Sequence, residues 1–450
     1  MTERFEDTLG ARLATLAREA VPESEAAALD ELPMARVVAM PSRRRLSTRP
    51  LLAAAAIITV IAVGGALLAT RHDNGTDVQG PKATWSTVPR SPLSPRYEHS
   101  TVFTGKEVLI WGGRDDPYTG TATAASPSQA ANNLLDDGAA YNVTTHTWRM
   151  LPKSPLSARF GAIAEWTGKE MLIVGGTATG PAAADFRRDG AAYNPKTNTW
   201  RRLPDAPGCP RFGAWTGTEL VVGGGCNGVP PASMSAALLP NTNYWKPLSV
   251  PPIPVNAFVT ANGAVAGFEY QTERVVRLHD PIAPTTPTKD RWETLPPLPI
   301  DRTASDFLAV TSLLTSGPDG SVTIVRTLAN PKHGRNTQLW RYDDQQHRWL
   351  NVGAFAIEGP SSVLDGSVPV ASTGSLLMWQ AFSADYSWFD TATGAKATTT
   401  KAPILLSFEG GSLVAIGDGQ FFIWGGKYKG LVGDPRGNQP SAEGAILTIQ

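Results

Sequence analysis

The chain has 450 residues, of which 40 are Lys or Arg and 40 are Asp or Glu, so its formal net charge at pH 7 is zero. Nucleic-acid binding depends on a basic surface, and a balanced charge gives no electrostatic reason to expect it. Glycine and proline together make up about 18% of the residues, above the usual ~12%, and this excess favours a fold rich in turns.

The first 49 residues are expected to contain one amphipathic helix. Apolar Phe5, Leu9, Leu13 and Leu16 follow a helical spacing, and charged residues lie mostly on the opposite face. A segment of this length buries too little apolar surface to be stable by itself. Two interpretations stay open: a docking segment for a cytosolic partner, or a passive tail.

Residues 50–70 are predicted to form a single transmembrane helix. The stretch 51–70 is uncharged, and a helix of this length spans about 30 Å, the thickness of the hydrocarbon core. Four arginines precede the helix and a polar linker, residues 71–83, follows it. The positive-inside rule therefore places the N-terminus in the cytosol and the remainder outside. A buried helix of a soluble protein is the alternative, and a cleaved signal fits less well because about fifty residues precede the apolar stretch.

Residues 84–450 repeat a unit of about fifty residues. An apolar run that ends in two glycines recurs as VLIWGG, MLIVGG, LVVGGG and FFIWGG. Three copies carry a tyrosine and a tryptophan seven residues apart, as in Tyr141 and Trp148. A Thr-Gly-x-Glu turn, as at residues 104–107, and an Asn or Asp turn after the tyrosine divide each unit into four short strands. Four antiparallel strands per repeat predict the blade of a β-propeller.

This pattern resembles the kelch repeats of galactose oxidase-like β-propellers. It is clearest in the first three copies and in the last, whereas the double glycine is missing between residues 250 and 404. The resemblance implies an all-β propeller of seven blades, or of six if a weak middle copy is not a full blade. An unrelated β-sandwich with repeated turns is the alternative. The preceding span would make it a propeller on a single-pass membrane anchor of bacterial type.

The two ends of the repeat region predict how the ring closes. The last copy ends without a tryptophan strand, and the strand at Trp85 has no strands before it. We expect the Trp85 strand to complete the last blade, because this removes a free sheet edge.

Both cysteines are expected to form a disulfide. Cys209 and Cys226 flank the inner hairpin of the third unit, and a strict register around residues 217–218 places them opposite each other. The extracytoplasmic side is the oxidising one, which favours the bond. Pro210 and the glycines at 223–225 are the features able to shift this register.

No catalytic residue, metal site or cofactor is predicted. The copper site of galactose oxidase needs two His, two Tyr and a Cys, whereas the six histidines here are scattered and the cysteines are explained by each other. The Asp box of sialidases is missing, and the arginines that begin inner strands are interpreted as repeat residues: Arg96, Arg159, Arg211 and Arg302. Four loop aspartates are either ordinary solvated carboxylates or a cation cluster: Asp115, Asp116, Asp136 and Asp137.

The binding face is predicted from the long loops between second and third strands. Loops 114–137 and 427–443 become neighbours on ring closure, and the loop of the second unit adjoins them. Tyrosine and arginine are typical of interface hot spots. The candidate ligand-binding residues are Arg114, Asp115, Asp116, Tyr118, Arg187, Arg188, Lys427, Tyr428, Lys429 and Arg436. The alternative is that Ala- and Ser-rich segments such as 119–131 are insertions without a binding role.

Together these features predict a membrane-anchored extracytoplasmic propeller that binds or senses a protein, a peptide or an envelope glycan. The alternative is a carbohydrate-active enzyme, oxidase- or glycosidase-like, whose catalytic residues the sequence does not identify. A repeat pattern specifies a scaffold and leaves the ligand and the oligomeric state open.

Overall fold

The chain divides into two units, Met1–Asp77 and Val78–Gln450, and every described residue belongs to the second. The computed structural model describes residues 83–116, 133–178, 186–226, 234–278, 292–300, 309–317, 319–330, 334–357, 370–382, 385–391, 396–398, 410–417, 419–427 and 439–450. The predicted amphipathic helix, transmembrane helix and most of the linker lie outside them. No helix long and apolar enough to span a membrane occurs in the described ranges.

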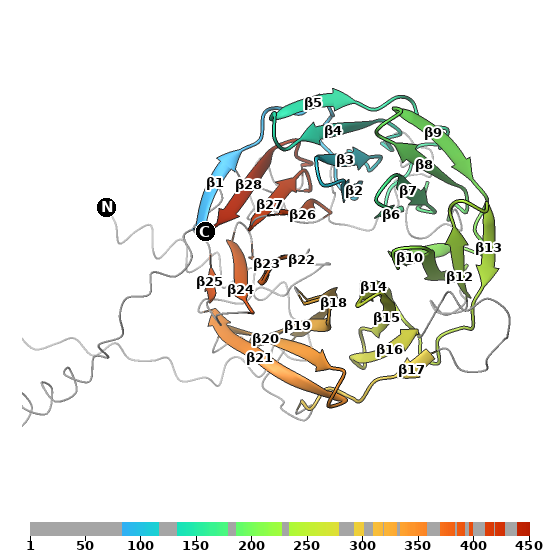
Figure 1. Ribbon diagram of the computed structural model, residues 1–450. Helices are drawn as coiled ribbons and strands as arrows, with labels where there is room; N and C mark the ends of the chain where they lie inside the picture. Colours follow the sequence, from blue (N-terminus) through green and yellow to red (C-terminus); the bar gives the residue numbers. More distant parts are fainter. Residues whose placement is uncertain are drawn as a thin grey trace, which may run out of the picture. The chain divides into compact units, whose positions relative to one another are not determined.

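Seven four-stranded antiparallel sheets form the blades of a β-propeller (Figure 1). This confirms the seven-bladed expectation and excludes the six-bladed alternative. Blade 1 consists of β2 (Ser100–Phe103), β3 (Glu107–Trp111), β4 (Gly138–Asn142) and β5 (Thr147–Met150). Blade 2 consists of β6 (Ile163–Trp166), β7 (Met171–Val174), β8 (Gly190–Asn194) and β9 (Thr199–Leu203). Blade 3 consists of β10 (Pro210–Trp215), β11 (Leu220–Gly224), β12 (Met234–Leu239) and β13 (Tyr244–Pro247).

The remaining blades repeat this order from the inside outward. Blade 4 consists of β14 (Ala257–Ala261), β15 (Ala264–Glu269), β16 (Arg274–Leu278) and β17 (Trp292–Thr294). Blade 5 consists of β18 (Ala309–Ser316), β19 (Val322–Asn330), β20 (Gly334–Asp343) and β21 (Arg348–Ile357). Blade 6 consists of β22 (Val370–Thr373), β23 (Leu376–Phe382), β24 (Asp385–Asp390) and β25 (Lys396–Thr398). Blade 7 consists of β26 (Ser412–Gly417), β27 (Gln420–Trp424), β28 (Gly444–Ile449) and β1 (Ala83–Thr87).

The N-terminal strand closes the ring, as the sequence predicts. β1 pairs antiparallel with β28, from Ala83 opposite Ile449 to Thr87 opposite Ala445. Trp85 also packs on Tyr386 of blade 6, with 5.6 Å between ring centres. The closing strand therefore completes the sheet of blade 7 and contacts the blade beside it.

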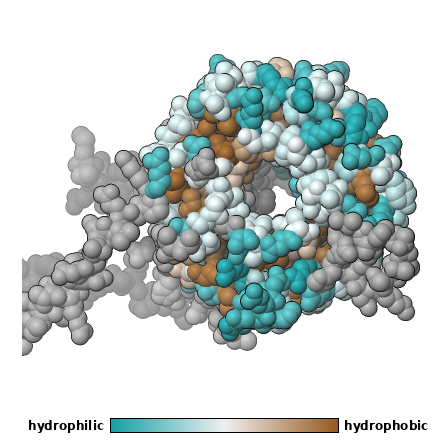
Figure 2. Space-filling view, viewed as in Figure 1, coloured by the Kyte–Doolittle hydropathy of each residue, from teal (hydrophilic) through white to brown (hydrophobic). Residues whose placement is uncertain are grey.

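The apolar core lies between blades and leaves the ring axis open. Each core cluster combines residues of neighbouring blades, as where Leu172 and Val174 of blade 2 meet Val222 and Leu238 of blade 3. Apolar side chains alternate between the two faces of a strand, so every blade has a face for each neighbour. Figure 2 shows the opening left at the centre of the ring.

The double glycines mark the closest approach of one blade to the next. Gly112 and Gly113 have φ angles of +71° and +96°, in the region that favours glycine. A Cβ on Gly112 would lie 2.9 Å from the carbonyl oxygen of Arg159, where blade 2 begins. The amide of Gly113 donates to this same oxygen at 2.9 Å. In blades 1 and 7 the motif thus combines a left-handed backbone with an inter-blade hydrogen bond, since Gly426 likewise donates to the carbonyl of Arg96.

The outer-strand tryptophans connect blades along the rim. Each donates its indole N–H to the backbone carbonyl of the residue four positions after the preceding rim tryptophan, at 2.7–3.0 Å: Trp148 to Pro89, Trp200 to Pro152, Trp245 to Pro204, Trp292 to Ser249 and Trp349 to Pro296. In blade 6 the position that matches the outer-strand tryptophan is occupied by Lys396. The repeated tryptophan is therefore a link between blades as well as a core residue.

A pair of glycine substitutions would separate backbone strain from close approach. Gly105 has a φ of +88° in open space, whereas Gly112 has a positive φ and faces the Arg159 carbonyl. We expect Gly105→Ala to lower the free energy of unfolding by about 1–2 kcal/mol through strain alone. Gly112→Ala should cost a further ~1–3 kcal/mol because the next blade must move. Chemical denaturation measures both, and equal costs would contradict the close-approach explanation.

Candidate functional site

Long connections between second and third strands occur on four consecutive blades. They comprise residues 425–443 in blade 7, 112–137 in blade 1, 175–189 in blade 2 and 225–233 in blade 3. The corresponding connections in blades 4 to 6 are residues 270–273, 331–333 and 383–384. Because successive strands alternate in direction, all of these open on one face of the ring. We call the part of this face over blades 7, 1, 2 and 3 the long-loop face.

A row of cations and aromatic rings runs beneath the long-loop face. The ammonium of Lys427 lies 5.0 Å from the centre of the Tyr97 ring. The guanidinium carbon of Arg114 lies 4.6 Å from the centres of both the Tyr97 and Phe160 rings. This basal row therefore joins blades 7, 1 and 2 through cation–π contacts. Lys427 is only 1% exposed, so it supports the face from below.

Carboxylates surround the centre of the basal row. The Nε of Arg114 lies 3.1 Å from Glu98 and 3.4 Å from Asp116. Burial raises the pKa of Tyr97; Arg114 opposes this effect and Asp116 reinforces it, so the phenol stays protonated at neutral pH. Burial also raises the pKa of the neighbouring Asp115. The surface around Arg114 thus offers hydrogen-bond donors and acceptors side by side.

Two fully buried arginines fix where the long connections end. Arg96 binds both carboxylate oxygens of Asp137 and donates to the carbonyl of Gly112 at 3.2 Å. Arg159 does the same with Asp189 and Gly175 in blade 2. These contacts agree with the interpretation of Arg96 and Arg159 as repeat residues. They also show that Asp137, whose side chain is 42% exposed, forms an ion pair with Arg96.

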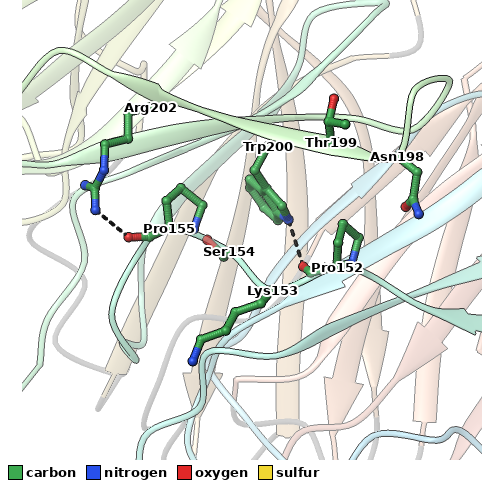
Figure 3. Close-up of a pocket in the computed structure, with 8 residues that line it drawn as sticks. All are labelled: Pro152, Lys153, Ser154, Pro155, Asn198, Thr199, Trp200 and Arg202. Atoms are coloured by element: carbon green, nitrogen blue, oxygen red, sulfur yellow. Dashed lines mark hydrogen bonds between the residues drawn. The ribbon is translucent and has the colours of Figure 1, made fainter.

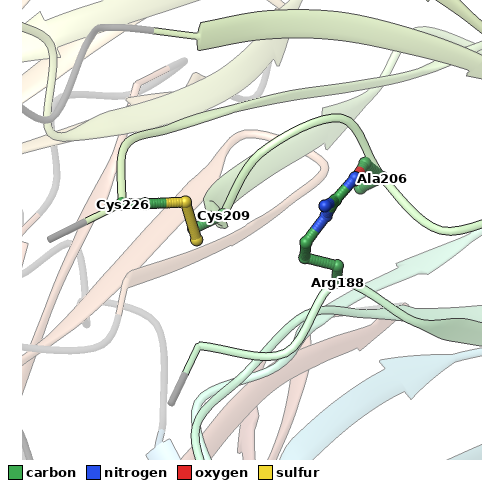
Figure 4. The surroundings of a disulfide bond; sticks show 4 residues. All are labelled: Arg188, Ala206, Cys209 and Cys226. Atoms are coloured by element: carbon green, nitrogen blue, oxygen red, sulfur yellow. A yellow bond between two sulfur atoms is a disulfide. The ribbon is translucent and has the colours of Figure 1, made fainter. Parts of the chain in front are cut away.

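A disulfide anchors the connection of blade 3. Cys209 and Cys226 are bonded, with a Cα–Cα distance of 5.2 Å (Figure 4). The strict register expected from the sequence is wrong in one detail: Pro210 pairs with Gly224 but Phe212 with Gly223, which leaves Arg211 as an extra residue. This shift takes Cys209 out of direct opposition to Cys226. The Cα atoms still lie within the range that a disulfide spans.

Arg188 ties the same region to blade 2. Its Nε donates to the carbonyl of Ala206 at 2.8 Å (Figure 4), and the amide of Ala206 donates back to the carbonyl of Arg188 at 2.8 Å. Arg211, one of the predicted repeat arginines, is exposed, and its guanidinium lies 4.8 Å from the centre of the Phe186 ring. The base of the long-loop face therefore extends from blade 7 to blade 3.

The structure brings together part of the predicted site. Arg114 and Lys427 are part of the basal row, Asp115 and Asp116 lie beside it, and Arg187 and Arg188 lie on blade 2. The predicted residues outside the described ranges are Tyr118, Tyr428, Lys429 and Arg436. Sequence reasoning missed the residues that organise this surface: Tyr97, Glu98 and Phe160. The arginine–aromatic dipeptide that recurs at the entries to blades 1 to 3, as in Arg159–Phe160, was the available signal.

One serine–histidine pair lies between the inner ends of blades 7 and 1. The Nε2 of His99 and the Oγ1 of Thr101 each lie 2.6 Å from the Oγ of Ser412. Burial, with help from Arg96, lowers the pKa of His99 to about 3, so the ring is a poor general base at neutral pH. In the described ranges, no three His, Cys, Asp or Glu side chains gather as metal ligands would.

Comparisons with known proteins were made for the whole sequence. No protein-family model matches the chain, and no curated protein matches it. The seven-bladed β-propeller is established by strand pairing.

The Arg159–Asp189 pair predicts a specific acid sensitivity. Burial opposes ionisation of Asp189, but Arg159, with Arg187, outweighs it and lowers the pKa of this carboxyl below its ordinary value of 3.8. A lowered folded-state pKa contributes stability above the unfolded-state value and loses it as the pH falls through the folded-state value. Asp189→Asn should therefore be less stable at neutral pH, with a flatter stability curve below about pH 3.8.

The measurement is urea denaturation across pH values, with exposed Asp205→Asn as the control. The control should follow the wild-type curve. An Asp189→Asn curve parallel to that of the wild type would contradict the proposed linkage.

The disulfide predicts equal effects of its two cysteines. Cys209→Ser and Cys226→Ser should each lower the free energy of unfolding under oxidising conditions, by at most ~3 kcal/mol for a bridge that closes a short loop. The double variant should cost little more, because either change removes the same bond. A double variant far less stable than both single variants would mean that the two residues act separately.

Proposed function

We propose that the protein is a kelch-type β-propeller that serves as a binding or sensing module. The helix at residues 50–70 would anchor it in the membrane, with the propeller outside. Its ligand would be a protein, a peptide or an envelope glycan, recognised at the long-loop face. The observation that carries this proposal is the concentration of long connections on four consecutive blades.

The base of the long-loop face supports a recognition role. Loops that carry binding residues are most useful when a rigid scaffold positions them. Here the basal row, the buried arginines and the disulfide fix the ends of the connections. The scaffold that holds the ends of the connections is therefore already ordered, and it loses little conformational entropy when a ligand binds.

The membrane placement is supported by sequence and by the disulfide. The uncharged stretch 51–70 follows an arginine-rich segment, which favours a cytosolic N-terminus. A disulfide between Cys209 and Cys226 suits an oxidising exterior. The kelch assignment is supported by the geometry of its motif residues, since the double glycines and tryptophans make the inter-blade contacts described above.

The enzyme alternative has weaker support. Among the described residues, Ser412 and His99 come closest to a nucleophile and its base. The low pKa of His99 argues against that use, and the pair links the inner strands of two blades. Binding is therefore the function that these contacts favour.

Protease digestion of intact cells tests the topology. External protease should remove the propeller and leave the N-terminal segment protected by the membrane. Release of the full-length protein by high salt or carbonate would contradict a membrane-spanning anchor.

Binding to cell envelopes tests the recognition face. Full-length protein with Tyr118→Ala, Tyr428→Ala and Arg436→Ala together should bind at least about tenfold more weakly, as expected for hot-spot residues. Its melting temperature should not change. The matched control carries Lys106→Ala and Lys169→Ala in exposed turns at the other end of the blades. Loss of binding in the control, with normal binding by the triple variant, would show that the face is assigned wrongly.

A further inference from the structure

A second polar surface lies on the outer rim, where residues 152–155 meet β9. The outer strands β5 of blade 1 and β9 of blade 2 follow one another around this rim (Figure 1). At their junction is an open groove of about 480 Å³, within the usual range for small-ligand sites. Trp200 of β9 and residues 152–155, which follow β5, form it (Figure 3).

Three hydrogen-bond acceptors of this groove are already engaged. The carbonyl of Pro152 accepts from the Trp200 indole at 3.0 Å, and that of Pro155 from Nη2 of Arg202 at 2.8 Å. The Oδ1 of Asn198 accepts from the hydroxyl of Tyr193 at 2.7 Å. What the groove offers a ligand is therefore mainly donors: the Lys153 ammonium, the remaining Arg202 N–H groups and the Asn198 amide.

The groove also carries two positive charges. Lys153 and Arg202 are both exposed, and neither forms an ion pair with another described residue. The positions that match Lys153 and Arg202 are Arg90 and Met150 in blade 1, and Asp205 and Pro247 in blade 3. Two cations thus line the groove beside blade 2, whereas the equivalent places in blades 1 and 3 carry one and none, and this favours an anionic ligand in the groove.

The floor of the groove is a fixed aromatic ring. Trp200 lies 5.0 Å from Tyr193 and 6.2 Å from Trp111, measured between ring centres, and its N–H is bonded to Pro152. A flat apolar platform beside cations suits a pyranose ring, whose C–H face is apolar and whose edge carries oxygens.

We propose that this rim groove binds an acidic sugar residue of a glycan. The carboxylate of a hexuronate would pair with Lys153 and Arg202, and its ring would stack on Trp200. Arginine and lysine form their strongest hydrogen bonds with such anionic oxygens. This site is distinct from the long-loop face and does not depend on the function proposed for it.

Calorimetric titration of the full-length protein with trigalacturonate tests the proposal. Binding should be detectable at millimolar or lower concentration, and Lys153→Ala with Arg202→Ala should weaken it at least about tenfold. The matched control, Arg90→Ala with Met150→Ala, changes the same two positions of blade 1 and should stay within about twofold of the wild type. The triple variant of the long-loop face should also bind normally, so failure of one site can be told from failure of the other.

Several outcomes would overturn the proposal. These are no binding up to about 10 mM trigalacturonate, equal binding of its neutral methyl ester, or an equal loss in the blade 1 control. Equal binding of poly-glutamate would assign the groove to acidic peptides instead. Loss of trigalacturonate binding in the long-loop variant would place the sugar site on the other face.

Discussion

Each blade of the propeller buries apolar faces against two neighbours, so the ring is complete only when its first and last blades meet. The β1–β28 pairing makes this junction between residues at opposite ends of the propeller sequence. Without it, β28 would present an unpaired edge, and the contact between Trp85 and Tyr386 would be lost. Closure therefore makes a series of similar repeats into one cooperative unit, and it places blade 7 beside blade 1, where the long connections meet.

The same inter-blade contacts position the chemistry at the surface. Glycine backbones and indole N–H groups bind backbone carbonyls at blade junctions, and the buried arginines bind carbonyls and carboxylates within their own blades. These groups fix the first and last residues of the connections and leave the middle of each free to differ. Blades 1 and 2 share nearly all of these contacts, yet their rim and loop residues differ. A repeat scaffold can in this way carry distinct surfaces without changing how its blades pack.

The sequence predicted the backbone better than the side-chain environment. Repeats with a period of about fifty residues indicate blades, and the unmatched Trp85 strand indicates how they close. The partners across blade junctions depend on the relative twist of two sheets, which a one-dimensional pattern does not contain. The contact of buried Lys427 with Tyr97 is of this kind. The pairing of Arg96 with Asp137 and the bulge at Arg211 lie within blades 1 and 3, and the repeat pattern does not specify them either. Tyr97 and Phe160 were missed because each appears in sequence as one more apolar residue of an inner strand.

The order of strands in blade 7 has a mechanical consequence. A pull from the N-terminal side of the chain reaches β1 first, and β1 is held in its sheet by β28 alone. A pull on Gln450 instead reaches β28, which is hydrogen-bonded on both sides by β27 and β1. The two ends of the propeller are therefore unequal under load: force from one side peels the closing strand from the ring, whereas force from the other must break two ladders at once.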